Sequence, residues 1–107
     1  MATQSSKVIV WNVRGLNSPA RRSAIYQAVT GANPAVVCFE ETKLQVVSPE
    51  IVKHCLGNRF ESFEYLPVAG TRGGILLAWD ATMASVSNPH RTTNTLTGLV
   101  RPASGGQ

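Results

Sequence analysis

Two short apolar runs, each ending abruptly in polar side chains, most constrain the fold of this 107-residue chain. They are residues 8–16 (VIVWNVRGL) and residues 36–43 (VVCFEETK). Each run has the length and the continuous apolar character of a buried strand. The two strand ends lie about 30 residues apart, which is enough chain for the crossover helix that adjacent parallel strands require. Functional side chains collect at the carboxyl ends of such strands, so we expect Asn12 and Glu41 to lie at one edge of an α/β sheet.

Helix start and stop signals occur between and after these runs. Ser18, followed by a proline, predicts the start of a helix, and Gly31 is expected at its C′ position. Ser48, again followed by a proline, predicts the start of a second helix, which Gly57 is expected to end. The sequence therefore predicts strand, helix, strand, helix over its first half.

Two further strands are expected before residue 81. The first is marked by three aromatic residues, Phe60, Phe63 and Tyr65. Residues 70–74 then predict a turn into a continuous apolar strand over residues 75–79.

The last part of the chain has a different composition. After residue 80, Ser and Thr become frequent and neither Asp nor Glu occurs again. Residues 95–100 have the pattern of one more strand, and His90 is expected in a loop. We accordingly expect a tail over residues 1–6, a partial domain over residues 7–80 and a Ser/Thr-rich continuation over residues 81–107.

Composition indicates which classes of protein this chain can belong to, but it says little about the function. A formal charge of +4 and a pI near 9.6 permit a polyanionic partner, but charged residues make up only 15% of the chain. No apolar stretch reaches the roughly 20 residues of a membrane span, and no signal peptide is recognisable. We expect an intracellular protein of nucleus or cytoplasm with no membrane partner. Cys38 and Cys55 lack the spacing of a zinc site or a disulfide framework and are expected to be reduced thiols.

Residues 8–16, 36–43 and 70–79 (GTRGGILLAW) resemble the endonuclease/exonuclease/phosphatase superfamily. The likeness is greatest to the amino-terminal endonuclease domain of plant LINE-type (non-LTR) retrotransposon polyproteins, which is related to apurinic/apyrimidinic endonucleases. The resemblance implies an α/β fold, the amino-terminal portion of a four-layered α/β sandwich in which two mixed sheets pack face to face. It also implies Mg²⁺-dependent cleavage of phosphodiesters in DNA.

The same resemblance assigns catalytic roles to Asn12 and Glu41. It implies that Glu41 is the metal ligand, and carboxylate oxygens are what Mg²⁺ prefers. Asn12 is implied to organise the metal and phosphate site; alternatively its amide caps the turn formed with Gly15, and the two roles are compatible. Glu40 stands where many relatives carry glutamine. Because neighbours in an extended strand face opposite sides, Glu40 is not expected to share a metal with Glu41.

Basic residues flank the expected active face. Arg14, Lys43 and Arg72 are either phosphate contacts or solvated charges, and the sequence leaves both interpretations open. Arg21 and Arg22 lie in the first turn of a helix, where positive charge opposes the helix dipole. A contact with an anion would explain this placement, but ordinary exposed arginines are the favoured interpretation.

The histidine and tryptophan residues are not assigned to the site. His54 and His90 lack the setting of the family's general-base histidine, so neither is given a catalytic role. Trp11 and Trp79 each belong to an apolar strand and are expected to pack in the core rather than stack on bases.

These observations predict a truncated Mg²⁺-dependent endonuclease-like domain of retrotransposon origin with little or no catalysis alone. The family's later Tyr, Asp-x-Asn and Asp-His elements have no counterpart in the 107 residues. The alternative is a small basic module that binds nucleic acid or a protein, and a third is an enzyme that still nicks DNA weakly. One sheet would leave an apolar face uncovered, so self-association or a protein partner is also expected.

Overall fold

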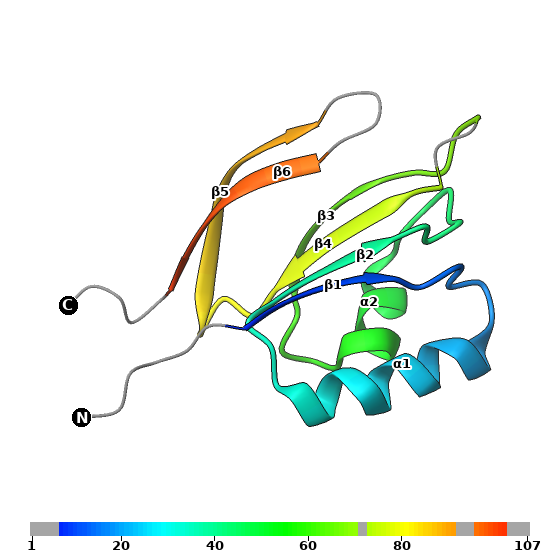
Figure 1. Cartoon of the computed structure of the whole chain (residues 1–107), viewed down its shortest axis with the longest axis horizontal. Coiled ribbons are helices and arrows are strands. Elements are labelled where there is room, and N and C mark those ends of the chain that lie inside the picture. The colour runs from blue at the N-terminus through cyan, green and yellow to red at the C-terminus, as the bar shows by residue number, and fades with distance from the viewer. Residues whose placement is uncertain (1–6, 71–72, 92–95, 103–107) are drawn as a thin grey trace.

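The protein is a small α/β domain with a mixed four-stranded sheet, two helices and a two-stranded hairpin (Figure 1). The computed structural model describes residues 7–70, 73–91 and 96–102. Along the chain the elements are β1 (Val8–Asn12), α1 (Pro19–Ala32), β2 (Val36–Glu40), α2 (Pro49–Leu56), β3 (Ser62–Leu66), β4 (Ile75–Trp79), β5 (Ala84–Arg91) and β6 (Leu96–Pro102).

The four-stranded sheet has the order β1-β2-β4-β3. Strands β1 and β2 are parallel neighbours with α1 between them in the chain, which confirms the predicted strand, helix, strand unit. Strand β4 runs antiparallel to both β2 and β3. The carboxyl ends of β1 and β2 therefore meet the amino end of β4 at one edge of the sheet, where Asn12 pairs with Glu40 and Glu40 with Ile75.

Both helices begin as the sequence predicts. The hydroxyl oxygens of Ser18 and Ser48 accept hydrogen bonds from the backbone N–H groups of Arg21 and Ile51, at 3.3 and 3.2 Å. A proline follows each cap, where its missing N–H is not needed. Gly57 ends α2 with φ 88°, as expected.

The end of α1 corrects the prediction for Gly31. Helix α1 continues through this glycine to Ala32, and the left-handed cap is Asn33, with φ 52°. The Asn33 N–H donates to the Val29 carbonyl oxygen at 3.1 Å. Asparagine tolerates the left-handed conformation, and Pro34 directly after it cannot continue the helix.

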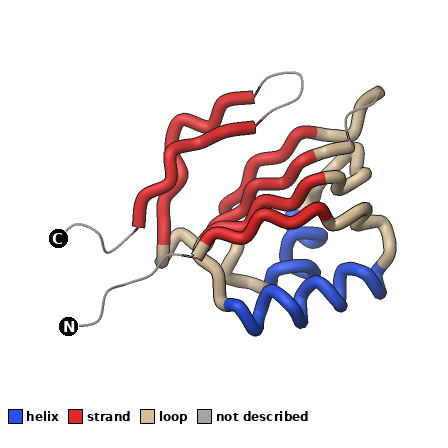
Figure 2. Tube along the Cα trace, viewed as in Figure 1, coloured by secondary structure: helices blue, strands red, loops and turns tan. Residues whose placement is uncertain are grey.

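The helices cover one face of the sheet and enclose the main core, as Figure 2 shows. Phe39 of β2 is completely buried there, and Trp11 of β1 meets it edge-on, with ring centroids 6.1 Å apart. Trp11 is 38% exposed because β1 is the edge strand, so it packs at the margin of the core. Trp79 packs against the smaller cluster on the opposite face.

The hairpin of β5 and β6 lies on the side of the sheet opposite the helices (Figure 2). Its first residue, Ala84, is buried against Val36 and Leu77. The expected loop around His90 is wrong, because residue 90 belongs to β5 and pairs with Thr97. The pairing register shifts between Ser87 and His90, a bulge that accommodates the missing N–H of the intervening proline.

Strand β6 includes residues 96–100 of the strand predicted over residues 95–100, and residue 95 lies outside the described residues; β5 was not predicted. Neither α1 nor α2, the helices of the described part of the chain, is long and apolar enough to span a membrane.

Candidate functional site

The candidate site lies where β1 and β2 end, and backbone hydrogen bonds extend their pairing beyond the regular strands. The N–H groups of Val13, Gly15 and Leu16 donate to carbonyl oxygens at the end of β2 and just after it, at 3.0, 2.7 and 2.9 Å. The acceptors are Glu40, Glu41 and Thr42, respectively. Two irregular loops are thus held side by side. Side chains on them are positioned by the backbone of both.

The segment before β4 also forms backbone hydrogen bonds with the loop after β2. Gly74 and Gly73 carbonyl oxygens accept from the N–H groups of Thr42 and Lys43, at 3.2 and 2.7 Å. A Cβ on Gly73 would lie 3.0 Å from Glu41 Cγ, and one on Gly74 would overlap the Thr42 hydroxyl oxygen. Of the predicted turn at 70–74 the structure describes residues 70, 73 and 74. An added Cβ would clash at Gly74 and be tightly packed at Gly73, because the backbone passes directly against Thr42 and Glu41.

Three non-glycine residues at this edge have left-handed backbone conformations. The φ angles of Arg14, Glu41 and Lys43 are 55°, 57° and 61°. Each such residue costs on the order of 1 kcal/mol, and strain of this kind clusters at functional sites. It also corrects the argument about Glu40: Glu41 has left the extended strand, so strict alternation of the two side chains does not apply.

Asn12 and Glu41, the two predicted catalytic residues, are in direct contact. The Asn12 side-chain amide donates to Glu41 Oε2 at 2.8 Å, and Asn12 Oδ1 accepts from the Arg14 N–H at 3.1 Å. Asn12 thus contacts the predicted metal ligand and also caps the turn, although the N–H that its side chain accepts from belongs to Arg14 rather than Gly15. The second carboxylate oxygen, Oε1, lies 3.9 Å from Lys43 Nζ.

Glu41 can hold a hard cation through this second oxygen. Its side chain is 45% exposed, and carboxylate oxygen is the donor that Mg²⁺ favours. Mg²⁺ commonly keeps several waters and uses one or two carboxylates, so this donor set fits. Within the described residues, His, Cys, Asp and Glu form no group of three or more able to hold a metal.

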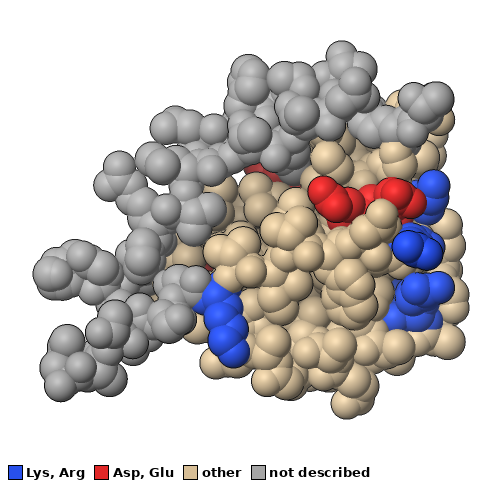
Figure 3. Space-filling view, viewed as in Figure 1, with Lys and Arg blue, Asp and Glu red and all other residues tan. Residues whose placement is uncertain are grey.

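The basic residues divide into two groups. Arg14 and Lys43 are exposed beside Glu41, and Figure 3 shows acidic and basic atoms side by side on this part of the visible face. Arg72, the third predicted phosphate contact, lies outside the described residues. Arg21 and Arg22 instead bind the loop after β1: Arg21 Nη1 donates to the Val13 carbonyl oxygen at 3.2 Å, and Arg22 Nε donates to that of Leu16 at 2.8 Å. These two arginines of α1 thus hold in place the loop after β1, which carries part of the site.

His54 and the two cysteines lie away from this edge. His54 Nε2 is 3.2 Å from the Ser23 hydroxyl, a contact between α2 and α1. Burial raises the pKa of the Cys55 thiol to about 11. Burial, and secondarily the charge of Glu40, also raises the pKa of Cys38. Neither thiol has the lowered pKa of a nucleophile.

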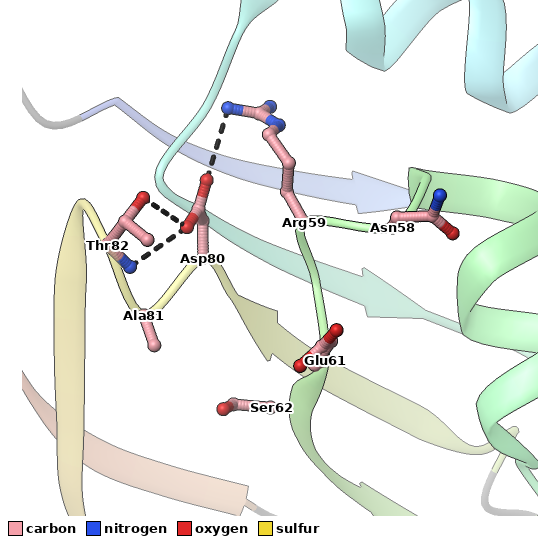
Figure 4. A pocket seen from close by; sticks show the side chains of 7 residues that line it. All are labelled: Asn58, Arg59, Glu61, Ser62, Asp80, Ala81 and Thr82. Atoms are coloured by element: carbon pink, nitrogen blue, oxygen red, sulfur yellow. Dashed lines mark hydrogen bonds and ion pairs between the residues drawn. The ribbon is translucent and has the colours of Figure 1, made fainter.

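A second polar cluster lies at the opposite end of the sheet, where β4 ends (Figure 4). The buried carboxylate of Asp80 is 3.2 Å from Arg59 Nη1 and accepts from the Thr82 N–H and hydroxyl, at 2.9 and 2.7 Å. These residues line a cavity of about 280 Å³. The sequence predicts only that the apolar strand over residues 75–79 ends here; the Asp-x-Thr spacing of Asp80 and Thr82, typical of an Asx turn, was the available signal for this cluster.

No protein-family model matches the chain, and a search of curated proteins finds no match.

Proposed function

We propose that the chain is the amino-terminal part of a Mg²⁺-dependent, endonuclease-like phosphodiesterase domain of the LINE retrotransposon type. The observation that supports this most directly is the Asn12–Glu41 contact, 2.8 Å long, at the carboxyl ends of two parallel strands. This is the edge at which α/β sheets carry their functional side chains. The open part of the sheet face opposite the helices would be where a second sheet completes a four-layered sandwich.

In this proposal each residue has a defined task. Glu41 would hold Mg²⁺ with its carboxylate, while Asn12 fixes the orientation of that carboxylate through Oε2. Arg14, Lys43 and Arg72 supply positive charge for phosphates of DNA. When bound, Mg²⁺ would neutralise charge on the scissile phosphate and favour formation of the attacking hydroxide.

We further propose that this chain has little or no catalysis alone. Phosphodiester hydrolysis needs donors for the charge that develops in the transition state and a base for the attacking water. Asn12 and Glu41 supply one amide and one carboxylate, and the other elements implied by the resemblance have no counterpart in the sequence. A second copy of the chain would add only the same two groups.

The test is nicking of supercoiled and abasic-site DNA by the purified chain with Mg²⁺ or EDTA, beside Glu41→Ala and the control Glu61→Gln. Glu61 is exposed and lines the cavity at the other end of the sheet. Nicking that needs Mg²⁺ and is lost only in Glu41→Ala would show that the chain assembles a working site. Equal background in all three proteins would support weak or absent catalysis. Mg²⁺-dependent nicking that survives in Glu41→Ala would contradict the assignment of Glu41.

A second candidate function is a basic module that binds nucleic acid or a protein, and the exposed edge strand favours its protein-binding form. Val8 and Val10 of β1 are 53% and 64% exposed, which is unusual for the apolar face of a sheet. An affinity for DNA that falls steeply with salt concentration but does not depend on Mg²⁺ would support the nucleic-acid-binding form of this candidate. Association that is abolished by Val10→Lys and retained by Val10→Thr would support the protein-binding form.

A further inference from the structure

The two oxygens of the Glu41 carboxylate have different partners. Oε2 accepts a hydrogen bond from the uncharged amide of Asn12, whereas Oε1 lies 3.9 Å from the ammonium of Lys43. Lys43 is the one cationic group within ion-pair distance of Glu41 in the described part of the chain. The position beside Oε1, which a divalent cation would take, therefore already faces a positive charge.

The backbone of Lys43 is fixed while its side chain is not. Its N–H donates to the Gly73 carbonyl oxygen at 2.7 Å, and its φ of 61° holds it in the left-handed region. The side chain is 50% exposed and ends in an ammonium on a flexible stem of four carbons. The ammonium can therefore leave Glu41 by rotation of its own side chain, without any change in the loop.

We propose that Lys43 is the counter-ion of Glu41 in the cation-free protein and that a divalent cation on Oε1 displaces its ammonium, which then binds a phosphate of DNA. This inference rests on the proposed function, because it takes Glu41 as the cation ligand. Two positive groups beside one oxygen repel each other, and the lysine is the partner that can move. The displaced ammonium is a strong phosphate donor.

Two consequences follow from this exchange. Lys43 weakens cation binding in the absence of DNA, because it competes for the same oxygen. It also couples the two ligands: the cation frees Lys43 for phosphate, and by linkage phosphate on Lys43 favours the cation to the same degree. Since exposed ion pairs are weak, we expect changes of about two- to fivefold in affinity.

The experiment titrates the full chain with Mn²⁺ and follows the unbound ion by electron paramagnetic resonance. The variants are Lys43→Met, Lys43→Arg, Glu41→Gln and the control Lys7→Met. Lys7 precedes β1 at the other end of the sheet, and its removal changes the net charge equally. We expect Lys43→Met to bind Mn²⁺ about two- to fivefold more tightly than the wild type, Lys7→Met and Lys43→Arg to resemble it, and Glu41→Gln to lose binding.

Anisotropy of a labelled DNA duplex tests the coupling. Mn²⁺ should strengthen DNA binding by the wild type about two- to fivefold more than it strengthens binding by Lys43→Met. If Mn²⁺ binding depends on Glu41 but is the same or weaker in Lys43→Met, or if the gain in DNA binding is equal in both proteins, the role of Lys43 is overturned while the proposed function stands. If none of the proteins binds Mn²⁺, the proposed function fails and this inference with it.

Discussion

The side-chain amide of Asn12 donates a 2.8 Å hydrogen bond to Glu41 Oε2 and joins the last residue of β1 to the first residue after β2. The orientation of this amide is determined, because its oxygen accepts from the Arg14 N–H and so its NH₂ must face the carboxylate. With Oε2 held in this way, the other carboxylate oxygen, Oε1, is left to Lys43 or to a cation.

Removal of this contact should destabilise the domain modestly. Asn12→Ala loses a hydrogen bond to a charged acceptor and the bond that closes the turn, so we expect the free energy of unfolding to fall by about 1–2 kcal/mol. Glu41→Gln and the double variant Asn12→Ala/Glu41→Gln complete a double-mutant cycle. Measured by urea unfolding, this cycle should give a coupling energy of about 0.5–1 kcal/mol. Asn58→Ala, on an exposed loop, is the matched control. Strictly additive single effects would show that the contact does not persist in solution.

The adjacency of Asn12 and Glu41 was predictable from the sequence. Two apolar runs of strand length that are joined by a capped helix favour parallel pairing. Parallel neighbours have their carboxyl ends at the same edge of the sheet. Both helices and the strands β1, β2 and β4 follow from such local signals, whereas the antiparallel direction of β4 does not. Ser18 and Ser48 before prolines, and the apolar run at 75–79, needed no tertiary information.

The features that the sequence did not reveal depend on tertiary contacts. Nothing in the identity of Glu41 or Lys43 favours a left-handed backbone; the hydrogen bonds from the loops of β1 and β4 impose it. The helix cap is Asn33 and not Gly31, because the proline after Asn33 cannot continue the helix. The sequence contains this signal, but the glycine gives a competing one. The pairing of Asp80 with Arg59, 21 positions earlier, is likewise a consequence of the fold.

Gly73 and Gly31 provide a matched pair of glycine substitutions. In Gly73→Ala the new methyl would lie 3.0 Å from Glu41 Cγ and 3.2 Å from Glu41 Cα, so the loop must shift and we expect a loss of about 1–3 kcal/mol. Gly31 lies inside α1 with nothing within 4 Å of an added Cβ, and Gly31→Ala should stabilise the protein by about 0.5–1 kcal/mol. Chemical denaturation of both variants measures this contrast. Equal effects at the two positions would mean that the Gly73 backbone does not pass against Glu41.

The Asp80 cluster should anchor the turn from β4 into β5. Asp80 is 2% exposed, and among the described residues Arg59→Met would leave its carboxylate with the two Thr82 donors. Because the arginine side chain is itself 44% exposed, we expect a loss of about 1–3 kcal/mol rather than the larger value of a fully buried pair. Guanidinium denaturation beside Glu61→Gln, which changes an exposed charge of the same cavity, tests this. Unchanged stability in Arg59→Met would show that the ion pair is not formed.

Cys55 should make stability depend on pH in the alkaline range. Burial raises the pKa of its thiol from 9.0 to about 11, so between these values the unfolded chain has lost the proton that the folded chain retains. The unfolded state then binds fewer protons, and the free energy of unfolding falls as pH rises from 9 to 11, by up to about 1 kcal/mol per pH unit. Well below pH 9 the thiol is protonated in both states and contributes no slope. Urea unfolding at several pH values should show a steeper decline for the wild type than for Cys55→Ala, whose loss of packing lowers stability equally at every pH. Parallel curves for the two proteins would contradict the raised pKa, because lysine and tyrosine titration is common to both.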